Sequence, residues 1–356
     1  MAQVLGLGLS HYPPLSMPDA KMAGILATTL EDPAIPAEAT DPANWSPTMR
    51  AEWGTDRGAA AAAGHRAALV ECFAKVRDTL DDFDPDVVLI WGDDQYENFR
   101  EDVIPAFTVC AYPDLDFHPW RHAQRSSMAE GGKPNAWDEG PDKHYRVKGD
   151  RAFGRKLATG LLEAGFDVAY AYQPLHHPGF AHAFGNAILY LDYDRRGWPY
   201  RTVAMPINCY GRRVISCRGF LTRFGDDIEF DPPSPSPTRC FDLGAQVGRW
   251  LATQEGRVAL IASSSWSHAF LCDHTWRLRP DTAADRLLYD ALVAGDLDVW
   301  RNQSLAAFER AGQQEMLNWS PLLGAMQALG TRLQWSRFVA TEVFNSNKVF
   351  AIFEPV

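Results

Sequence analysis

Histidine side chains follow two short apolar runs of the sequence, in positions where they could bind a metal or transfer protons. His11 follows Val4–Leu9, and His268 follows Val258–Ser263 after a series of serines. In open α/β sheets, ligands bind beyond the carboxyl ends of the strands, so an imidazole placed there is held rigidly beside a cleft. A single histidine of this kind is more often an ordinary hydrogen-bonded loop residue. A functional interpretation therefore requires several such residues to meet in one site.

The apolar runs alternate with segments of helical periodicity, which predicts an α/β fold with a central, mostly buried mixed β-sheet flanked by helices. The expected strands are Val4–Leu9, Asp86–Trp91, Phe107–Tyr112, Asp167–Tyr172, Arg201–Ile207, Val258–Ser263 and Lys348–Phe353. The expected helices are His65–Leu80, Arg151–Ala164, Ala245–Gln254 and Asp285–Gly295. We expect a single catalytic domain over residues 1–356, with long loop insertions at 31–58 and 113–150 that are functional lids or locally disordered.

Composition excludes several classes of function. Of the 356 residues, 46% are hydrophobic and 22% charged, as in ordinary globular proteins, and the net charge of −11 argues against a nucleic-acid surface. The six cysteines are scattered without a CxxC spacing, so neither a zinc cluster nor a disulfide framework is expected. No apolar stretch approaches the roughly 20 residues of a membrane span. We therefore expect a cytoplasmic protein with no nucleic-acid or membrane partner.

Five segments in order along the chain form a wider pattern. They are GLGLSHYPPL at the start, PDVVLIWGDDQYENF (Pro85–Phe99), LHHPGFAHAF (Leu175–Phe184), the series MPINCY, PTRCFDLGAQVGRWL and VALIASSSWSH, and AGQQEMLNW (Ala311–Trp319). Each is weak alone, but together they resemble the class III extradiol ring-cleavage dioxygenases, as represented by the catalytic subunit of protocatechuate 4,5-dioxygenase. The two long insertions lie outside the resemblance.

The resemblance implies a mononuclear Fe(II) site and assigns roles to five side chains. His11, Gln95 and Glu315 fall at the metal-ligand positions, while His268 and His177 fall at those of the acid–base and oxygen-stabilising pair. Two imidazoles and one carboxylate on one face of Fe(II) leave positions open for a catecholate and dioxygen. The expected partners are a small aromatic substrate, O2 and a second copy of the chain in a homo-oligomer (dimer).

Gln95 is a departure from that pattern, because the superfamily has histidine at the corresponding position. A glutamine carbonyl is a harder and weaker donor toward Fe(II) than imidazole. Either Gln95 binds the metal through oxygen, or Asp94, Glu97 or His65 replaces it, or the metal site is degraded.

Another group of histidines, His176, His177 and His182, could indicate a separate metal cluster, but the resemblance accounts for His177 without one. The leading hypothesis is a dioxygenase that opens a dihydroxylated or aminohydroxylated aromatic ring. The alternative is a metal-binding relative with the same fold and a non-oxidative or binding role.

Overall fold

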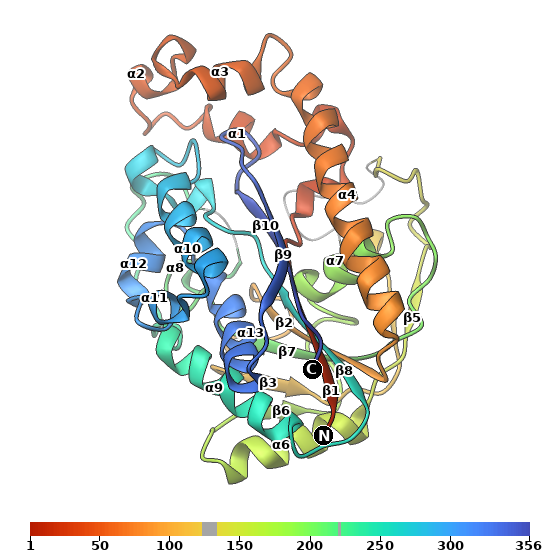
Figure 1. Ribbon diagram of the computed structural model, residues 1–356. Coiled ribbons are helices and arrows are strands. Elements are labelled where there is room, and N and C mark those ends of the chain that lie inside the picture. The colour runs from red at the N-terminus through yellow and green to blue at the C-terminus, as the bar shows by residue number, and fades with distance from the viewer. Residues whose placement is uncertain (123–133, 220–221) are drawn as a thin grey trace.

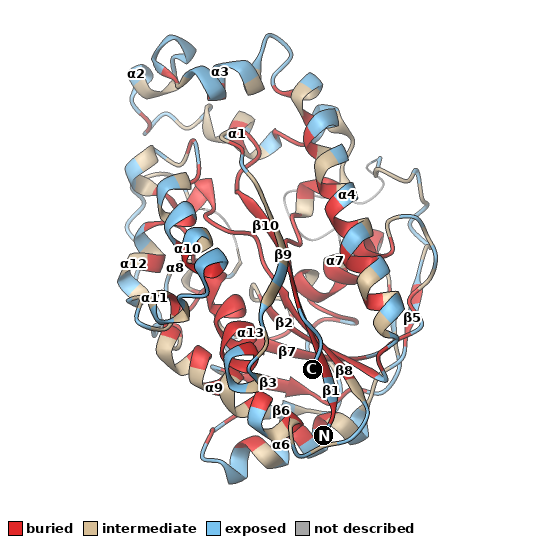
Figure 2. Cartoon of the chain, viewed as in Figure 1, coloured by how far each residue is buried: buried red, intermediate tan, exposed pale blue. Residues whose placement is uncertain are grey.

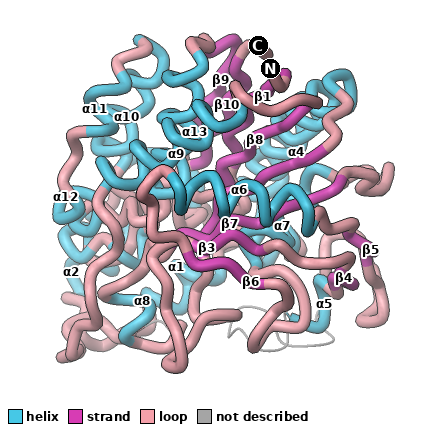
Figure 3. Tube along the Cα trace, turned by 90° about the horizontal axis from the view of Figure 1, so that it is seen from below, coloured by secondary structure: helices cyan, strands magenta, loops and turns pink. Residues whose placement is uncertain are grey.

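An eight-stranded sheet forms the centre of the computed structural model, which describes residues 1–122, 134–219 and 222–356 (Figure 1). The strand order is β6-β3-β7-β2-β8-β1-β10-β9, and Figure 3 shows the strands as one continuous band. The strands are β1 (Gln3–Leu9), β2 (Val87–Asp93), β3 (Thr108–Cys110), β6 (Ala169–Ala171), β7 (Arg201–Ile207), β8 (Arg257–Ser263), β9 (Leu333–Val339) and β10 (Lys348–Phe353).

The strand directions confirm the predicted mixed sheet. Strands β7, β2, β8 and β1 are parallel to their neighbours, whereas β10 runs antiparallel to β1 and β9 antiparallel to β10. At the other edge β3 pairs with β6 in parallel and meets β7 in the antiparallel sense. The carboxyl ends of β1, β2, β7 and β8 therefore lie at the same edge of the sheet. The segments that follow these four strands are close together in space.

Helices cover both faces of the sheet because the buried strands are apolar on both sides. Along β2, Val87, Leu89 and Trp91 belong to one core cluster, and Val88 and Ile90 belong to the other. One face packs against helices α6 (Arg151–Glu163), α9 (Pro237–Leu251) and α13 (Met316–Leu329). The other packs against α4 (Ala59–Phe83) and α7 (His182–Leu191) (Figure 1). Figure 2 shows the buried strands between these layers.

Helix α13 lies unusually close to its neighbours, and glycines make this possible. A Cβ atom at Gly8 of β1 would lie 2.3 Å from the Trp319 ring, and one at Gly244 of α9 would lie 1.8 Å from the Pro321 carbonyl oxygen. A Cβ at Gly6 of the same strand would lie 2.2 Å from the sulfur of Met326 in α13, so both glycines of β1 allow α13 to pack closely. That packing positions the start of α13 beside the carboxyl ends of β1 and β8.

The seven predicted strands and four predicted helices are all present, most of them with ends shifted by one to three residues, but α4 begins well before the predicted His65 and α9 well before the predicted Ala245. Strand β9 was not predicted, since it is an edge strand in which intermediate burial replaces a clear alternation. The predicted helix Asp285–Gly295 is α10 (Thr282–Ala294). The described helices not yet named are α1 (Gly24–Thr29), α2 (Ala37–Thr40), α3 (Pro47–Trp53), α5 (Pro119–His122), α8 (Arg213–Ser216), α11 (Leu297–Arg301) and α12 (Leu305–Arg310).

The two predicted insertions contain short regular elements. Segment 31–58 includes α2 and α3, and segment 113–150 includes α5 and the antiparallel pair β4 (Leu115–Phe117) and β5 (Tyr145–Val147). Residues 123–133 of the second insertion lie outside the described residues. Where it is described, this insertion packs on α7: the Phe117 ring occupies the space that a Cβ at Gly185 would need. Among the described helices, none is both long and apolar enough to cross a membrane.

Candidate active site

His11 and Glu315 meet at the carboxyl edge of the sheet, although they come from opposite ends of the sequence. His11 is the second residue after β1, and Glu315 directly precedes α13. Nε2 of His11 lies 3.6 Å from Oε2 of Glu315, and both side chains are about 1% exposed. The packing of α13 on β1 thus brings together the two residues that the sequence assigned to a metal. That they bind one stays a prediction.

The protonation of the His11 ring follows from its neighbours. Nδ1 of His11 lies 3.1 Å from Oγ of Ser263, and the same hydroxyl donates its proton to the carbonyl of Ala183 at 2.7 Å. Because a serine hydroxyl has a single proton to donate, Ser263 must accept a hydrogen bond from Nδ1–H of His11. Nε2 therefore bears the lone pair and faces Glu315.

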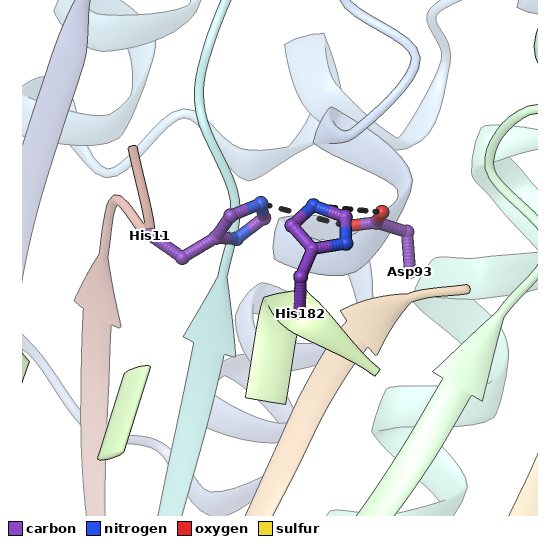
Figure 4. Close-up of side chains that lie close together, drawn as sticks. All are labelled: His11, Asp93 and His182. Atoms are coloured by element: carbon purple, nitrogen blue, oxygen red, sulfur yellow. Dashed lines mark ion pairs between the residues drawn. The ribbon is translucent and has the colours of Figure 1, made fainter. Parts of the chain in front are cut away.

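Two residues without an assigned metal role lie beside His11: Asp93, the last residue of β2, and His182, the first of α7 (Figure 4). Nε2 of His11 is 3.9 Å from Oδ1 of Asp93, and Nε2 of His182 is 3.9 Å from Oδ2 of the same carboxyl group. One ligand atom from each of the three residues lies within 4.8 Å of the others. The two imidazole rings stand almost perpendicular, with centroids 5.1 Å apart.

Glu97 holds His182 in place. Its carboxylate lies 2.8 Å from Nδ1 of His182 and also accepts the backbone N–H of His182 at 3.1 Å from each oxygen. A carboxylate at the first residue of a helix interacts favourably with the helix dipole. Glu97 therefore fixes both the start of α7 and the orientation of the first side chain on it.

The Glu315 carboxylate is surrounded by hydrogen-bond donors. Oε1 accepts from the hydroxyl of Tyr210 and lies 3.2 Å from Nε2 of His268, and Oε2 accepts the backbone N–H of Ser265 at 2.5 Å. Because a carboxylate can only accept, Nε2 of His268 is the protonated ring nitrogen. Glu315 therefore touches both His268 and, through its other oxygen, His11.

Burial and neighbouring charges set the ionisation of these groups. Burial lowers the pKa of His11 to about 4, so its ring is neutral near pH 7. Burial alone would raise the pKa of Glu315, but the imidazoles of His268 and His11 outweigh it and lower that pKa to about 2. Glu315 is therefore a carboxylate, and His11 a neutral base, over the physiological range of pH.

At Asp93 and His182 the pKa values are raised, whereas those of His11 and Glu315 are lowered. Burial, followed by the charge of Glu315, raises the pKa of Asp93 well above its ordinary value. Burial disfavours the charged form of His182, yet Glu97 beside it more than compensates and raises the pKa of that ring to about 10. Three carboxyl groups close to two imidazoles make this a place that favours positive charge.

The donor atoms fit a divalent metal ion. Within the described part of the chain, Nε2 of His11 and Oδ2 of Asp93 are buried and have no hydrogen-bond partner. Buried polar atoms are rarely left unpaired, and imidazole nitrogen with carboxylate oxygen suits iron and related metals. Metal–ligand bonds of about 2.0–2.2 Å require two ligand atoms to lie within about 4.4 Å of each other. The His11–Glu315, His11–Asp93 and His182–Asp93 separations all meet that requirement.

The alternatives considered for Gln95 are engaged elsewhere. The carboxylate of Asp94 accepts the backbone N–H groups of Glu97, Asn98 and Phe99 and so shapes the loop after β2. His65 belongs to α4, and its buried ring packs against Phe344 with the ring centroids 4.8 Å apart. Glu97 holds His182, as described.

Gln95 is half-buried, and its side chain makes no hydrogen bond to a described residue. Its predicted role as a metal ligand stays a prediction. His177 is buried in the loop before α7, where its Nδ1 accepts the N–H of Gly179 at 3.3 Å and its charge helps to lower the pKa of Glu97. It lies on the side of the site formed by Glu97 and His182, and its predicted role is likewise untested.

Sequence reasoning missed Asp93 and His182. Both lie inside segments that were recognised, GDDQYENF and HHPGFAHAF, but the predicted ligand position lay two residues after Asp93. His182 was weighed only as part of a separate cluster with its neighbours. The available signal for His182 was that it lies in the same segment as His177. Its role became visible only from the position of α7, which begins at His182.

Comparisons with known proteins agree with the motifs. Residues 230–351, which include His268 and Glu315, match the family described as the catalytic LigB subunit of aromatic ring-opening dioxygenase. A 2,3-dihydroxyphenylpropionate/2,3-dihydroxicinnamic acid 1,2-dioxygenase of Photorhabdus laumondii is 24% identical over 201 residues, covering 56% of this chain and 48% of that protein. A protein of the same name from Mycobacterium sp. is 28% identical over 232 residues, covering 65% and 59%.

The chain thus spans about half the length of the curated relatives that it matches. Among solved structures, an uncharacterized protein from Escherichia coli K12 aligns with a TM-score of 0.43 and 13% identity over 79% of this chain and 91% of that one, a likeness too low to add to the argument. Over residues 230–351 and along the stretches that match the named relatives, the chain is therefore similar to the class III extradiol ring-cleavage dioxygenases.

Proposed function

We propose that this protein is an Fe(II)-dependent dioxygenase that opens the ring of a small aromatic substrate bearing two neighbouring hydroxyl groups, or a hydroxyl and an amino group. The observation that supports this most strongly is the position of Glu315. One of its oxygens lies 3.6 Å from Nε2 of His11, and the other lies 3.2 Å from Nε2 of His268. A single carboxylate therefore joins a metal-binding imidazole to a second imidazole that is free to exchange protons.

His11 and Glu315 would hold the metal, with Asp93 beside them. Bound Fe(II) would supply adjacent positions for the substrate oxygens and for O2. The protein contributes a fixed set of donors, because the His11 ring is set by Ser263 and the Glu315 carboxylate by Tyr210 and the Ser265 amide. Donors held in this way need no rearrangement when the metal binds.

His268 is the proposed acid–base residue. Since its Nε2–H donates to Glu315, Nδ1 bears the lone pair, and Nδ1 is buried with no hydrogen-bond partner in the described ranges. Nδ1 is therefore the atom that would take a proton from a substrate hydroxyl and return it as the ring opens. The negative charge of Glu315 stabilises the imidazolium that forms in between.

The site is open to solvent only on the side of His182 and Glu97, among the site residues described above. Asp93, His11, Glu315 and His268 are at most about 5% exposed, whereas the side chains of His182 and Glu97 are 22% and 23% exposed. The substrate would therefore enter past the start of α7. The buried wall opposite excludes water and strengthens the electrostatic interactions within the site.

The test is oxygen uptake by the protein loaded with Fe(II) under anaerobic conditions. We expect one O2 to be consumed for each ring opened with one or more of catechol, protocatechuate, 2,3-dihydroxyphenylpropionate and 2-aminophenol. Resorcinol is the matched control, because its hydroxyl groups are too far apart to bind one ion together. If the protein holds iron and consumes no oxygen with any adjacent dioxygenated ring, the proposal fails and a non-oxidative or binding role takes its place.

A further inference from the structure

The third metal position is the point at which this chain departs from the motif that it resembles. We propose that His182, oriented by Glu97, provides the second imidazole ligand of the metal, with Asp93 as an additional carboxylate beside it. This inference rests on the proposed iron site and deepens it. It also makes Gln95 unnecessary as a ligand.

The position of His182 supports this role. The ring points from the first turn of α7 toward His11 and Asp93, which lie at the ends of β1 and β2 (Figure 4). One ligand atom of each residue lies within 4.8 Å of the others, so a shift of less than about 1 Å brings all three within bonding reach of one ion. His11, His182 and a carboxylate then form the two-histidine, one-carboxylate set that is typical of non-heme Fe(II) oxygenases.

The protonation pattern supports it independently. Glu97 lies 2.8 Å from Nδ1 of His182 and can only accept, so Nδ1 carries a proton. Nε2 is directed at Asp93 and is the nitrogen at which a metal ion would take the place of a proton. A metal-binding histidine almost always donates its other ring N–H to a carboxylate, a backbone carbonyl or water. His182 has this arrangement with Glu97, and His11 has an equivalent one with Ser263.

The same hydrogen bonds fix the two imidazoles relative to each other. Ser263 accepts from His11 and donates to the carbonyl of Ala183, the residue that follows His182 in α7. The start of α7 is thus tied to the end of β8 on one side and to Glu97 on the other. Both ligand nitrogens are positioned by one rigid network.

The test uses Co(II), which binds similar ligand sets, does not require O2 and reports its coordination through visible absorption. Metal-free protein would be titrated with Co(II) as wild type and as the His182→Ala, Glu97→Gln and Gln95→Ala variants. We expect His182→Ala to lose at least about tenfold in Co(II) affinity and to change the absorption spectrum. Glu97→Gln should lose about 10- to 100-fold, the usual effect of removing a carboxylate partner of a ligating histidine.

Gln95→Ala is the matched control and should bind Co(II) like the wild type. A second variant, His182→Gln, keeps an amide that can hydrogen-bond to Glu97, and its loss of affinity at an unchanged unfolding temperature would separate ligation from folding. The inference is overturned if His182→Ala and His182→Gln bind Co(II) as tightly as wild type, or if Gln95→Ala is the variant that loses the metal.

This readout is independent of ring cleavage. If no aromatic substrate is oxidised but His182→Ala loses Co(II), the ligand assignment stands and the proposed function fails. If substrates are cleaved by wild type and equally well by a His182→Ala variant with undiminished affinity, the ligand assignment alone is wrong.

Discussion

Ser263 fixes the ring of His11, because its hydroxyl oxygen accepts Nδ1–H at 3.1 Å while its hydroxyl hydrogen is donated to the carbonyl of Ala183. Ser263→Ala removes this partner and leaves the imidazole free to rotate or to move its proton to Nε2. We expect metal affinity to fall about tenfold or more, since partners of ligating histidines usually contribute 10- to 100-fold. Calorimetric titration of the metal-free protein would measure the effect.

Two neighbouring serines provide the control for that experiment. The side-chain oxygens of Ser264 and Ser265 are buried and have no hydrogen-bond partner among the residues that the structure describes. Ser265→Ala preserves the backbone N–H that binds Glu315 and should retain the metal affinity of the wild type. Equal losses for Ser263→Ala and Ser265→Ala would show that the strand end matters only as a packing element.

Glu315→Gln should release the metal. The amide keeps the shape of the side chain but loses the charge, and its NH2 group would face donors such as the Tyr210 hydroxyl or the Ser265 amide. We expect the bound iron per chain to fall at least tenfold, as measured by metal analysis after loading and gel filtration. The comparison variant is Glu309→Gln, whose carboxylate pairs with Arg212 near the surface and should not alter the iron content.

His268→Phe should separate catalysis from metal binding. The phenyl ring fills a similar space but neither takes nor returns a proton, so turnover should fall by about 10²- to 10⁴-fold. Iron content should stay near that of wild type, because Glu315 keeps its bonds from Tyr210 and Ser265. A variant that loses both iron and activity would instead identify His268 as a ligand.

Asp285 gives a prediction of pH dependence away from the metal. This buried carboxyl accepts from the Ser267 amide at 3.1 Å, from Gln313 at 2.7 Å and from Asn347 at 2.8 Å. Burial nevertheless raises its pKa from 3.8 to about 6. Between these two values the unfolded chain has released the proton and the folded chain retains it. The free energy of unfolding therefore falls as the pH rises through that window.

Urea unfolding of wild type and Asp285→Asn between pH 4 and about 7 would measure this effect. The stability of wild type relative to the variant should decrease by up to about 3 kcal/mol as the pH rises, since one pKa unit corresponds to about 1.4 kcal/mol. The asparagine does not titrate, so it removes the contribution of this group. A difference that stays constant with pH would contradict the raised pKa.

Gly244→Ala should be strongly destabilising because the new methyl group would lie 1.8 Å from the Pro321 carbonyl oxygen, which is backbone and cannot move aside. The resulting separation of α9 from α13 should lower the free energy of unfolding by about 1–3 kcal/mol or more. Gly64→Ala is the reference, since Gly64 is exposed in α4 with no atom within 4 Å of the added methyl. It should be neutral or stabilise the protein by up to about 1 kcal/mol.

The sheet could be predicted from the sequence because its strands are short apolar runs with clear ends. β1 and β8 were recognised almost to the residue, and with them the positions of His11 and His268. β9 escaped because its seven residues are of mixed character and lie at an edge, where only one side contacts the core. The pattern of apolar residues predicts a strand well where the strand is fully buried and poorly where the strand is only partly buried.

The site was only partly predictable, for a geometric reason. His11 and Glu315 each belong to a motif, but the contribution of His182 depends on where α7 begins relative to the ends of β1 and β2. That placement is set by Glu97 and by the Ser263–Ala183 bond, neither of which has a sequence signature. A contact that depends on how a helix docks on a sheet cannot be read from the spacing of residues along the chain.

The meeting of His11 with Glu315 also constrains the order of events during synthesis. The first of these residues leaves the ribosome long before the second, and α13, which holds Glu315 beside β1, lies within the last fifty residues of the sequence. A nascent chain shorter than this lacks one of the donors and the helix that covers β1. The proposed iron site would therefore be complete only after almost all of this sequence has been translated, and the growing chain would not hold a redox-active metal in an incomplete site.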